Sequence, residues 1–250
     1  MISRKASVGK AIVERTAIIY GESRIGDKSY IGGYSIIGYP SKETLEKIYL
    51  YNKNTAYEET QALHYPQVDD VDIGAGAVIG SQCVIRSHVV IYERVYIGDR
   101  VKTGHHVLIR EDSRVGDNTL IGSGTIVDGH VAIGSGVSIQ SGVYIPSMVV
   151  IKDNVFIGPR VVFTNDKYPP SRRLVETIVE EGAVIGANST IIAGVRIGKR
   201  AVVAAGSIVT RDVPDNMVVM GIPARVVMRR DEYEDKKLRY EKASIKTHDL

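Results

Sequence analysis

His130 and Asp166 are the side chains of this sequence whose types and spacing best suit proton transfer, and Asn165, beside Asp166, completes the candidate catalytic set. An imidazole or a carboxylate within hydrogen-bond reach can take a proton from an attacking amine or hydroxyl group. Backbone amides at an exposed turn can stabilise the oxyanion that such an attack creates on a carbonyl group. His130 and Asp166 are 36 residues apart, so they meet only if the chain returns to the same edge of the fold.

A six-residue repeat can return the chain in this way. An α-helix spaces its apolar residues by three and four, and a strand spaces them by two. A period of six, with a second small or β-branched position four places on, predicts short β segments separated by tight turns that contain Gly or Asn. The repeated positions are Ile73, Ile79, Ile85, Ile91, Ile97, Thr103, Ile109, Val115, Ile121, Val127, Ile133, Ile139, Ile145, Ile151, Ile157 and Phe163. The same register occurs at Val13, Ile19, Ile25, Ile31 and Ile37, and again at Val179, Ile185, Ile191, Ile197, Val203 and Val209.

Two segments interrupt the repeat and one follows it, within a single repeat domain expected over residues 1–228. Residues 39–70 are an insertion that opens like a short helix, and its tyrosines could stack on a nucleotide or pack against a neighbouring subunit. Residues 164–178 form a Pro-rich, basic break, which we interpret as half of an active site. The charged tail, residues 229–250, is expected to be helical and is given no chemical role.

The composition excludes several classes of protein. The 32 basic and 29 acidic residues are too balanced for a nucleic-acid surface. A single cysteine excludes an intrachain disulfide and fits a reducing compartment. No apolar run approaches the roughly 18 residues that span a bilayer, and the N-terminus has no apolar core of signal-peptide length. We therefore expect a cytoplasmic protein with neither a nucleic acid nor a membrane as partner.

The repeat resembles that of the hexapeptide-repeat acyltransferases. This resemblance implies an all-β fold, a left-handed parallel β-helix, with the insertion and the helical tail added to it. It also implies a homotrimer with active sites in the clefts between subunits. Residues 212–227, DVPDNMVVMGIPARVV, resemble the C-terminal signature of the acetyl-CoA-dependent members, so acetyl-CoA is the expected co-substrate and no metal is required. The implied coenzyme contacts are Gly221, Pro223, Ala224 and Arg225 at the adenosine, Ala187 and Ala205 at the pantetheine arm, and Lys199 and Arg200 at the phosphates.

Two stretches resemble one branch of this family, the enzymes that N-acetylate an amino group on a nucleotide-linked sugar. They are VSIQSGVYI at 137–145 and VFIGPRVVFTNDKYPP at 155–170. The resemblance implies that Gln140, Ser141 and Arg172 contact the substrate. The chain departs from the branch where Ser141 and the following Gly replace two Asn, and where Arg172 does not directly follow a single Pro.

Counting coils gives independent support for a site at His130 and Asp166. Two coils of eighteen residues separate them, which places them on one edge about 10 Å apart. His88 and His106 are eighteen residues apart, so they should stack on a different edge. We predict that the protein transfers an acetyl group from acetyl-CoA to the amino group of a nucleotide-linked amino sugar.

Three alternatives remain open at this point. An O-acetyltransferase would differ only in its acceptor, a sugar hydroxyl, and would depend more on a histidine base. A γ-type carbonic anhydrase also resembles these repeats, and its zinc would need His88, His105 and His106. A non-catalytic β-helix scaffold would have little use for the broken stretch or for the ending at 221–225.

Overall fold

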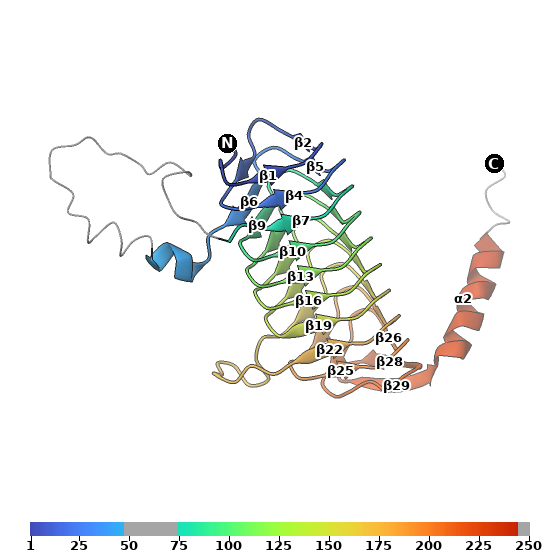
Figure 1. The fold of residues 1–250 in the computed structure, drawn as a ribbon. Helices are drawn as coiled ribbons and strands as arrows, with labels where there is room; N and C mark the ends of the chain where they lie inside the picture. The colour runs from blue at the N-terminus through green and yellow to red at the C-terminus, as the bar shows by residue number, and fades with distance from the viewer. Residues whose placement is uncertain (48–74, 245–250) are drawn as a thin grey trace.

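Stacked strands of two to six residues form the three faces of a prism in the computed structural model. The structure describes residues 1–47 and 75–244. Each coil visits sheets 1, 2 and 3 in turn (Figure 1). Sheet 1 consists of β1 (Ser7–Val8), β4 (Arg24–Ile25), β7 (Val78–Ile79), β10 (Tyr96–Ile97), β13 (Arg114–Val115), β16 (Ala132–Ile133), β19 (Val149–Ile151), β22 (Thr177–Val179) and β25 (Arg196–Ile197). Sheet 2 consists of β2 (Ile12–Val13), β5 (Tyr30–Ile31), β8 (Val84–Ile85), β11 (Lys102–Thr103), β14 (Leu120–Ile121), β17 (Ser138–Ile139), β20 (Phe156–Ile157), β23 (Val184–Ile185), β26 (Val202–Val203), β28 (Met217–Gly221) and β29 (Ala224–Arg229). Sheet 3 consists of β3 (Ile18–Ile19), β6 (Ile36–Tyr39), β9 (Val90–Tyr92), β12 (Leu108–Ile109), β15 (Ile126–Val127), β18 (Tyr144–Ile145), β21 (Val162–Phe163), β24 (Thr190–Ile191) and β27 (Ile208–Val209).

The period of six produces this prism because three repeats complete one coil. Ile97 lies beside Val115 in the next coil, eighteen residues later, and the pairing is parallel. In most strands the second residue points inward, and so does the small or β-branched residue just before the strand, so a ladder rich in Ile and Val fills the prism and excludes water. Cys83 is part of this ladder and is fully buried. The predicted all-β, left-handed parallel β-helix is confirmed.

Tight turns join the sheets, and we name the resulting corners edge 1/2, edge 2/3 and edge 3/1. Most turns contain a residue with a positive φ, as at His130 (60°) and Asn188 (55°). Such a conformation is costly for most side chains and less so for Gly and Asn, as at Gly124 (68°) and Asn188. The Gly that follows an inward aliphatic residue, as at Gly116, instead lies where a Cβ would meet the backbone of the next coil.

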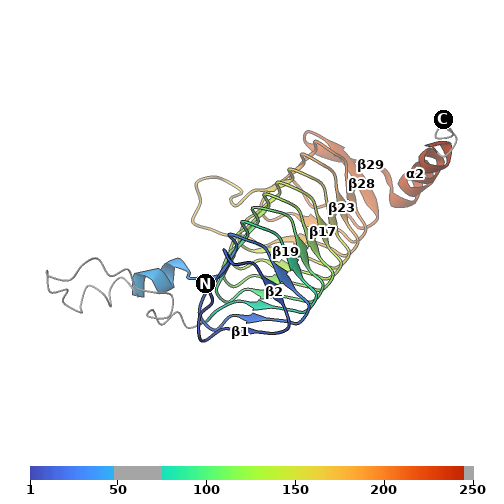
Figure 2. The same ribbon diagram turned by 90° about the horizontal axis from the view of Figure 1, so that it is seen from above.

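Both interruptions of the repeat leave the prism at edge 3/1. The first lies between β6 and β7. It adds 36 residues to the eighteen of one coil, since Arg24 pairs with Val78. The second lies between β21 and β22. It adds ten residues to the eighteen of one coil, since Val150 pairs with Ile178. The short helix at residues 42–47 and the loop at residues 164–176 project from the same side of the prism (Figure 1, Figure 2). Most of the predicted insertion, 48–70, lies outside the described residues.

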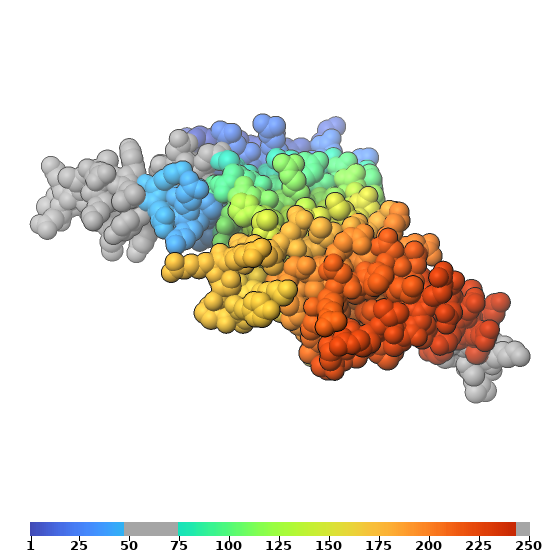
Figure 3. All heavy atoms as spheres, turned by 90° about the horizontal axis from the view of Figure 1, so that it is seen from below, coloured from blue at the N-terminus to red at the C-terminus, as the bar shows by residue number. Residues whose placement is uncertain are grey.

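The C-terminal end of the prism closes with an antiparallel hairpin of β28 and β29, followed by α2 (Arg230–Ser244). The predicted helical tail is thus confirmed over these residues. Helix α2 stands clear of the prism (Figure 1), and in a view from below the loop at residues 164–176 and the hairpin lie at separate places on the surface (Figure 3). Over residues 1–47 and 75–244, no helix combines the length and the apolar character needed to cross a membrane.

Candidate functional site

The sequence-predicted site residues fall on all three edges of the prism. Edge 3/1 carries His130, Asn165, Asp166 and Arg172, because these follow strands of sheet 3 and precede strands of sheet 1. Edge 2/3 carries Gln140, Ser141, Ala187 and Ala205, and the hairpin brings Gly221, Pro223 and Arg225 to the same end of the prism. Edge 1/2 carries Lys199 and Arg200. No single edge of one chain therefore carries all of the predicted site residues.

On edge 3/1, His130 lies in the turn between β15 and β16, with an exposed side chain. Its backbone N–H donates to the carbonyl of Glu111 in the preceding coil, at 3.1 Å. Asp166 begins the loop that follows β21, two coils further on, as the register predicts. Thr164 fixes the base of that loop, because its hydroxyl accepts a hydrogen bond from the N–H of Ala193 (2.9 Å) and donates one to the carbonyl of Asp166 (3.2 Å).

A connected row of side chains on edge 3/1 was missed by the sequence analysis. The rings of Tyr39 and Tyr92 lie 5.1 Å apart, and the guanidinium of Arg110 lies 5.8 Å from the Tyr92 centroid. Arg110 reaches Asp128 in the next coil at 3.6 Å. The hydroxyl of Tyr144 donates to the Asp128 carboxylate at 2.8 Å. The eighteen-residue spacing of positions 92, 110 and 128 is the signal that would have found this row.

Tyr144 acts as a donor throughout the neutral pH range. Burial, and then the hydrogen bond to Asp128, raise the pKa of Tyr144 to about 12. The phenol therefore keeps its proton and holds one oxygen of Asp128 in place. The second oxygen of Asp128 lies 3.6 Å from the Arg110 guanidinium.

The root of the insertion is fixed by a buried carboxylate. Glu93 is 1% exposed and accepts hydrogen bonds from the N–H of Ser41 at 3.0 Å and from the hydroxyls of Ser41 and Thr44. Arg94 adds an ion pair at 2.7 Å. Burial raises the pKa of Glu93, but these hydrogen bonds and the guanidinium outweigh it and lower that pKa overall. The helix at residues 42–47 is thereby held beside Tyr92.

Edge 2/3 carries small residues toward its C-terminal end. Ala205 is exposed, and a Cβ added at Gly206 would meet no heavy atom within 4 Å. The N–H of Gly221 donates to the hydroxyl of Ser207 at 3.2 Å, which sets the hairpin tip against this edge. Ala187 and Ala205, expected from the sequence to lie at the pantetheine arm, thus occupy turns of one edge, in successive coils.

Lys199 and Arg200 lie away from this edge. The Lys199 ammonium forms an ion pair with Glu181 at 2.8 Å, and the carbonyl of Arg200 accepts a hydrogen bond from Arg230 at 3.2 Å. Arg160 is exposed on edge 2/3, in the turn after β20, and it was not singled out from the sequence. Its position eighteen residues after Gly142, another turn of that edge, was the available signal.

The histidines near the N-terminal end of edge 2/3 stack as their spacing predicts. The rings of His88 and His106 lie 4.7 Å apart, and that of Tyr34 lies 5.2 Å from His88. His105 Nδ1 lies 2.7 Å from the hydroxyl oxygen of Ser87. In the part of the chain that the structure describes, no three His, Cys, Asp or Glu side chains converge as metal ligands would.

Sheet 3, which joins edge 2/3 to edge 3/1, has an outer face without charged residues in its described strands. Sheet 1 presents Arg24, Arg114 and Arg196 on its outer face, and sheet 2 presents Lys102. The outward residues of sheet 3 are Ile18, Ile36, Val90, Leu108, Ile126, Tyr144, Val162, Thr190 and Ile208. An uncharged face of this extent is typical of a protein–protein interface.

Comparisons with known proteins agree with the repeat and with the fold. Residues 76–111 and 112–147 match a family described as bacterial transferase hexapeptide (six repeats), and residues 176–211 match the hexapeptide repeat of succinyl-transferase. A 2,3,4,5-tetrahydropyridine-2,6-dicarboxylate N-acetyltransferase from Staphylococcus aureus is 48% identical over 84 residues, which span 34% of this chain and only 34% of that relative.

Two solved structures match this chain to different degrees. The UDP-N-acetylglucosamine acyltransferase from Campylobacter jejuni superimposes with a TM-score of 0.60 at 16% identity, over 94% of this chain and 83% of that one, and so shares the fold. PerB from Caulobacter crescentus, in complex with CoA and GDP-perosamine, matches with a TM-score of 0.45 at 23% identity, over 52% of this chain and 57% of that one.

Proposed function

Because the chain belongs to the hexapeptide-repeat acyltransferase family, we propose that it transfers an acetyl group from acetyl-CoA to the amino group of a nucleotide-linked amino sugar. The observation that carries the proposal is the arrangement of edges. Small side chains occur toward the C-terminal end of edge 2/3, a row of polar side chains and a projecting loop follow edge 3/1, and the uncharged sheet 3 separates them. The similarity to an N-acetyltransferase supports nitrogen as the acceptor atom.

Acetyl-CoA would lie along edge 2/3 with its adenosine at the hairpin tip, beside Gly221, Pro223 and Arg225. Its pantetheine arm would pass Ala205 and Ala187 toward Gln140 and Ser141. The proposal takes Arg160, rather than Lys199 and Arg200, as a contact for the coenzyme phosphates, because only Arg160 lies on this edge.

The reaction centre would form between two copies of the chain in a homotrimer. If sheet 3 of each copy faces the threefold axis, edge 2/3 of one copy lies beside edge 3/1 of the next. His130 and Gln140 belong to the same coil, so in a parallel trimer they lie at the same level along the axis. The thioester and the acceptor amine would meet there, with the loop at residues 164–176 beside them.

The chemistry then follows from the groups at that level. His130 or Asp166 takes the proton that the protonated amine must lose. The neutral nitrogen attacks the thioester carbonyl carbon and forms the C–N bond, and turn amides stabilise the oxyanion. When the oxyanion collapses the C–S bond breaks, the coenzyme A thiolate takes up the proton held by the base, and the attacking nitrogen loses its second proton to solvent as the amide forms. Asn165 and Arg172 would orient the sugar from the loop.

One observation favours a second acceptor class. The N-acetyltransferase relative is named for a cyclic dicarboxylate, and the match is 48% identical over 84 residues. The cations Lys167, Arg172 and Arg173 of the loop could bind carboxylates as well as phosphates. The second candidate function is therefore acetylation of a small amino dicarboxylate or related ring nitrogen.

Coenzyme A release from acetyl-CoA, followed with a thiol reagent, tests the proposal. The panel contains UDP-, dTDP- and GDP-linked amino sugars, their hydroxyl counterparts, simple amino sugars and the cyclic dicarboxylate. We expect turnover on a nucleotide-linked amino sugar and a loss of about 100-fold or more in Asp166→Ala. Asp235→Asn, on helix α2, serves as the control and should match the wild-type rate. Turnover on hydroxyl acceptors alone would contradict the proposal in favour of an O-acetyltransferase, and turnover on the dicarboxylate alone would favour the second candidate.

A further inference from the structure

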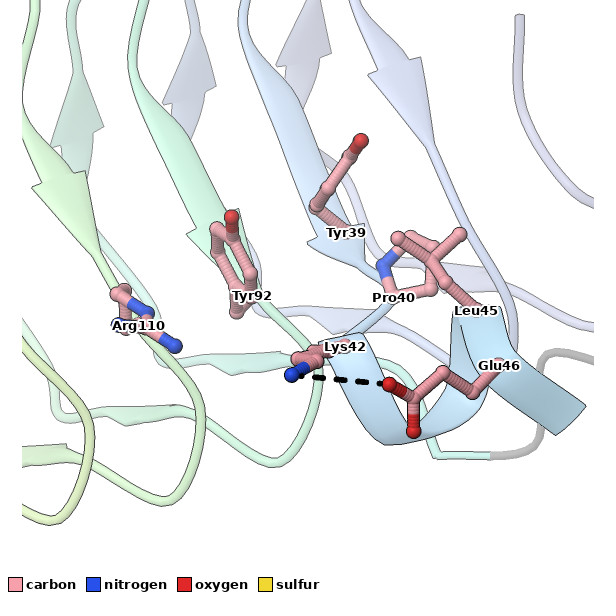
Figure 4. Close-up of a pocket in the computed structure, with 7 residues that line it drawn as sticks. All are labelled: Tyr39, Pro40, Lys42, Leu45, Glu46, Tyr92 and Arg110. Carbon is pink, nitrogen blue, oxygen red and sulfur yellow. Dashed lines mark ion pairs between the residues drawn. The ribbon is translucent and has the colours of Figure 1, made fainter.

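A pocket of about 600 Å³ opens on edge 3/1 at the root of the insertion (Figure 4). Its lining comes from the ends of β6 and β9, from the turn after β12, and from the helix at residues 42–47. The lining residues are Tyr39, Pro40, Lys42, Leu45, Glu46, Tyr92 and Arg110. Its volume is in the range of small-molecule sites.

We infer that this pocket binds the nucleoside diphosphate part of the acceptor. The inference rests on the proposed function, since it assigns a subsite to the substrate named there. It separates the acceptor into a base and diphosphate bound at the insertion root and an amino sugar that extends along edge 3/1 toward the loop.

The aromatic part of the pocket suits a nucleobase. Tyr92 is half-buried, and Tyr39 packs against it with the two ring planes inclined by 62°. In Figure 4 the Tyr92 ring stands between Arg110 and Tyr39. A tyrosine ring fixed in this way offers a flat surface of low conformational freedom, on which a base or ribose can stack.

The charged part of the pocket suits a diphosphate. The Arg110 guanidinium bonds to Glu111 at 2.8 Å and lies 3.6 Å from Asp128, yet its side chain remains 38% exposed. These carboxylates fix the guanidinium in place, so that its remaining N–H groups can meet a phosphate. Lys42 is 85% exposed and paired only loosely with Glu46, at 3.7 Å. A diphosphate would attract Lys42 and repel Glu46.

The position of the pocket along the prism matches the length of the proposed substrate. Asp128 and His130 lie two coils beyond Tyr92, about 10 Å away, and Thr164 lies three coils beyond Arg110, about 14 Å away. An extended nucleotide-linked hexose bridges such distances. A base at Tyr92 and a diphosphate at Arg110 therefore bring the sugar beside Asp128 and its amino group to the start of the loop.

Calorimetric titration of the full chain with UDP, dTDP and GDP, and with the matching uncharged nucleosides, tests the inference without acetyl transfer. Lys42→Ala should weaken binding of the preferred diphosphate about threefold, and Glu46→Gln should tighten it about twofold, with neither changing nucleoside binding. Arg110→Met should weaken diphosphate binding at least about tenfold. Tyr92→Leu should weaken the diphosphate and the nucleoside alike.

The chain offers matched controls for each variant. Lys47 and Glu43 form an ion pair of 2.8 Å on the same helix but do not line the pocket, so Lys47→Ala and Glu43→Gln should leave binding unchanged. Tyr96, exposed on sheet 1, provides Tyr96→Leu as the control for the aromatic variant. Because Lys42 and Glu46 are exposed, their variants should fold normally, and thermal melting checks this.

The outcomes separate this inference from the proposed function. Absence of diphosphate binding by the wild-type protein would overturn the inference. So would equal changes in diphosphate affinity from the variants of the Lys42–Glu46 pair and those of the Lys47–Glu43 pair. If a nucleotide-linked amino sugar is acetylated while its KM is unchanged in Arg110→Met and Lys42→Ala, the pocket assignment fails and the reaction stands. If the diphosphate binds with the expected charge dependence and no amino sugar is acetylated, the nucleotide site stands and the reaction fails.

Discussion

At the residue scale, the turn at His130 is built by its backbone, so its side chain is available for chemistry. The backbone N–H and carbonyl of His130 bond to the coils on either side, at 3.1 Å and 3.4 Å. Its φ of 60° is one that Asn adopts readily, as Asn188 does at 55° in another turn. His130 can therefore be replaced by Asn with little disturbance of the fold.

We predict that His130→Asn lowers kcat about 100-fold, with little change in the KM for acetyl-CoA and little change in melting temperature. The reason is the loss of a group that accepts the proton of the amine. His106→Asn changes a turn of the same conformation on edge 2/3 and is the matched control. Steady-state kinetics with the best acceptor of the panel measure both variants. Equal losses in the two would show that the effect is not specific to His130.

The sequence predicted individual positions well wherever the repeat was unbroken. The stack of His88 on His106 and the burial of Cys83 follow from counting by six and by eighteen. The placement of Lys199 could not be predicted in the same way. The loop after β21 adds ten residues to its coil, which is not a multiple of six, so the edge on which later residues lie depends on where the extra residues leave the prism.

At the scale of elements, the insertion root depends on Glu93. This buried carboxylate joins β9 to Ser41 and Thr44 at the start of the helix at residues 42–47. The hydroxyl of Ser41 also accepts a hydrogen bond from the N–H of Thr44 at 3.4 Å, in the manner of a helix N-cap. Sequence patterns showed that the helix begins here but not what holds it, because Glu93 lies 49 residues after Thr44.

We predict that Glu93→Gln destabilises the protein by about 1–3 kcal/mol at pH 7, because the buried hydrogen bonds lose their charged acceptor. Since folding lowers the pKa of Glu93, its stabilisation is present above the ordinary pKa of 4.5 and is lost as the pH falls through the lowered value. The melting-temperature difference between wild type and variant should therefore be full at pH 7 and shrink below about pH 4.5.

Glu43→Gln is the control for this prediction, because Glu43 is exposed on the same helix and its carboxylate pairs with Lys47. Trypsin cleavage near Lys42 and Lys47 gives a second readout, since Glu93→Gln should speed it and Glu43→Gln should not. A melting-temperature difference that persists unchanged at pH 3.5 would contradict the assigned role of the Glu93 carboxylate.

At the scale of the whole molecule, sheet 3 separates two kinds of surface, one along edge 2/3 and the other along edge 3/1. Edge 2/3 carries small residues toward its C-terminal end, and edge 3/1 carries the polar row, the pocket and both interruptions. The fold was predictable because the aliphatic period is almost unbroken. The separation of the edges was not, since a repeat of six marks every turn alike and only the three-dimensional coil distinguishes one edge from another.

The central claim is that the reaction takes place between edge 2/3 of one copy and edge 3/1 of the next, and mixed oligomers test it most directly. Ala205→Trp should block the coenzyme along edge 2/3, and Asp166→Ala should disable the other edge, so that each variant alone is inactive. Co-expressed with different tags at equal levels and purified as mixed trimers, the two should recover about a third of wild-type activity, because each mixed trimer has one cleft of its three that combines two intact edges. Activity that stays at the level of the separate variants would show that both edges must come from one chain, and would contradict the account.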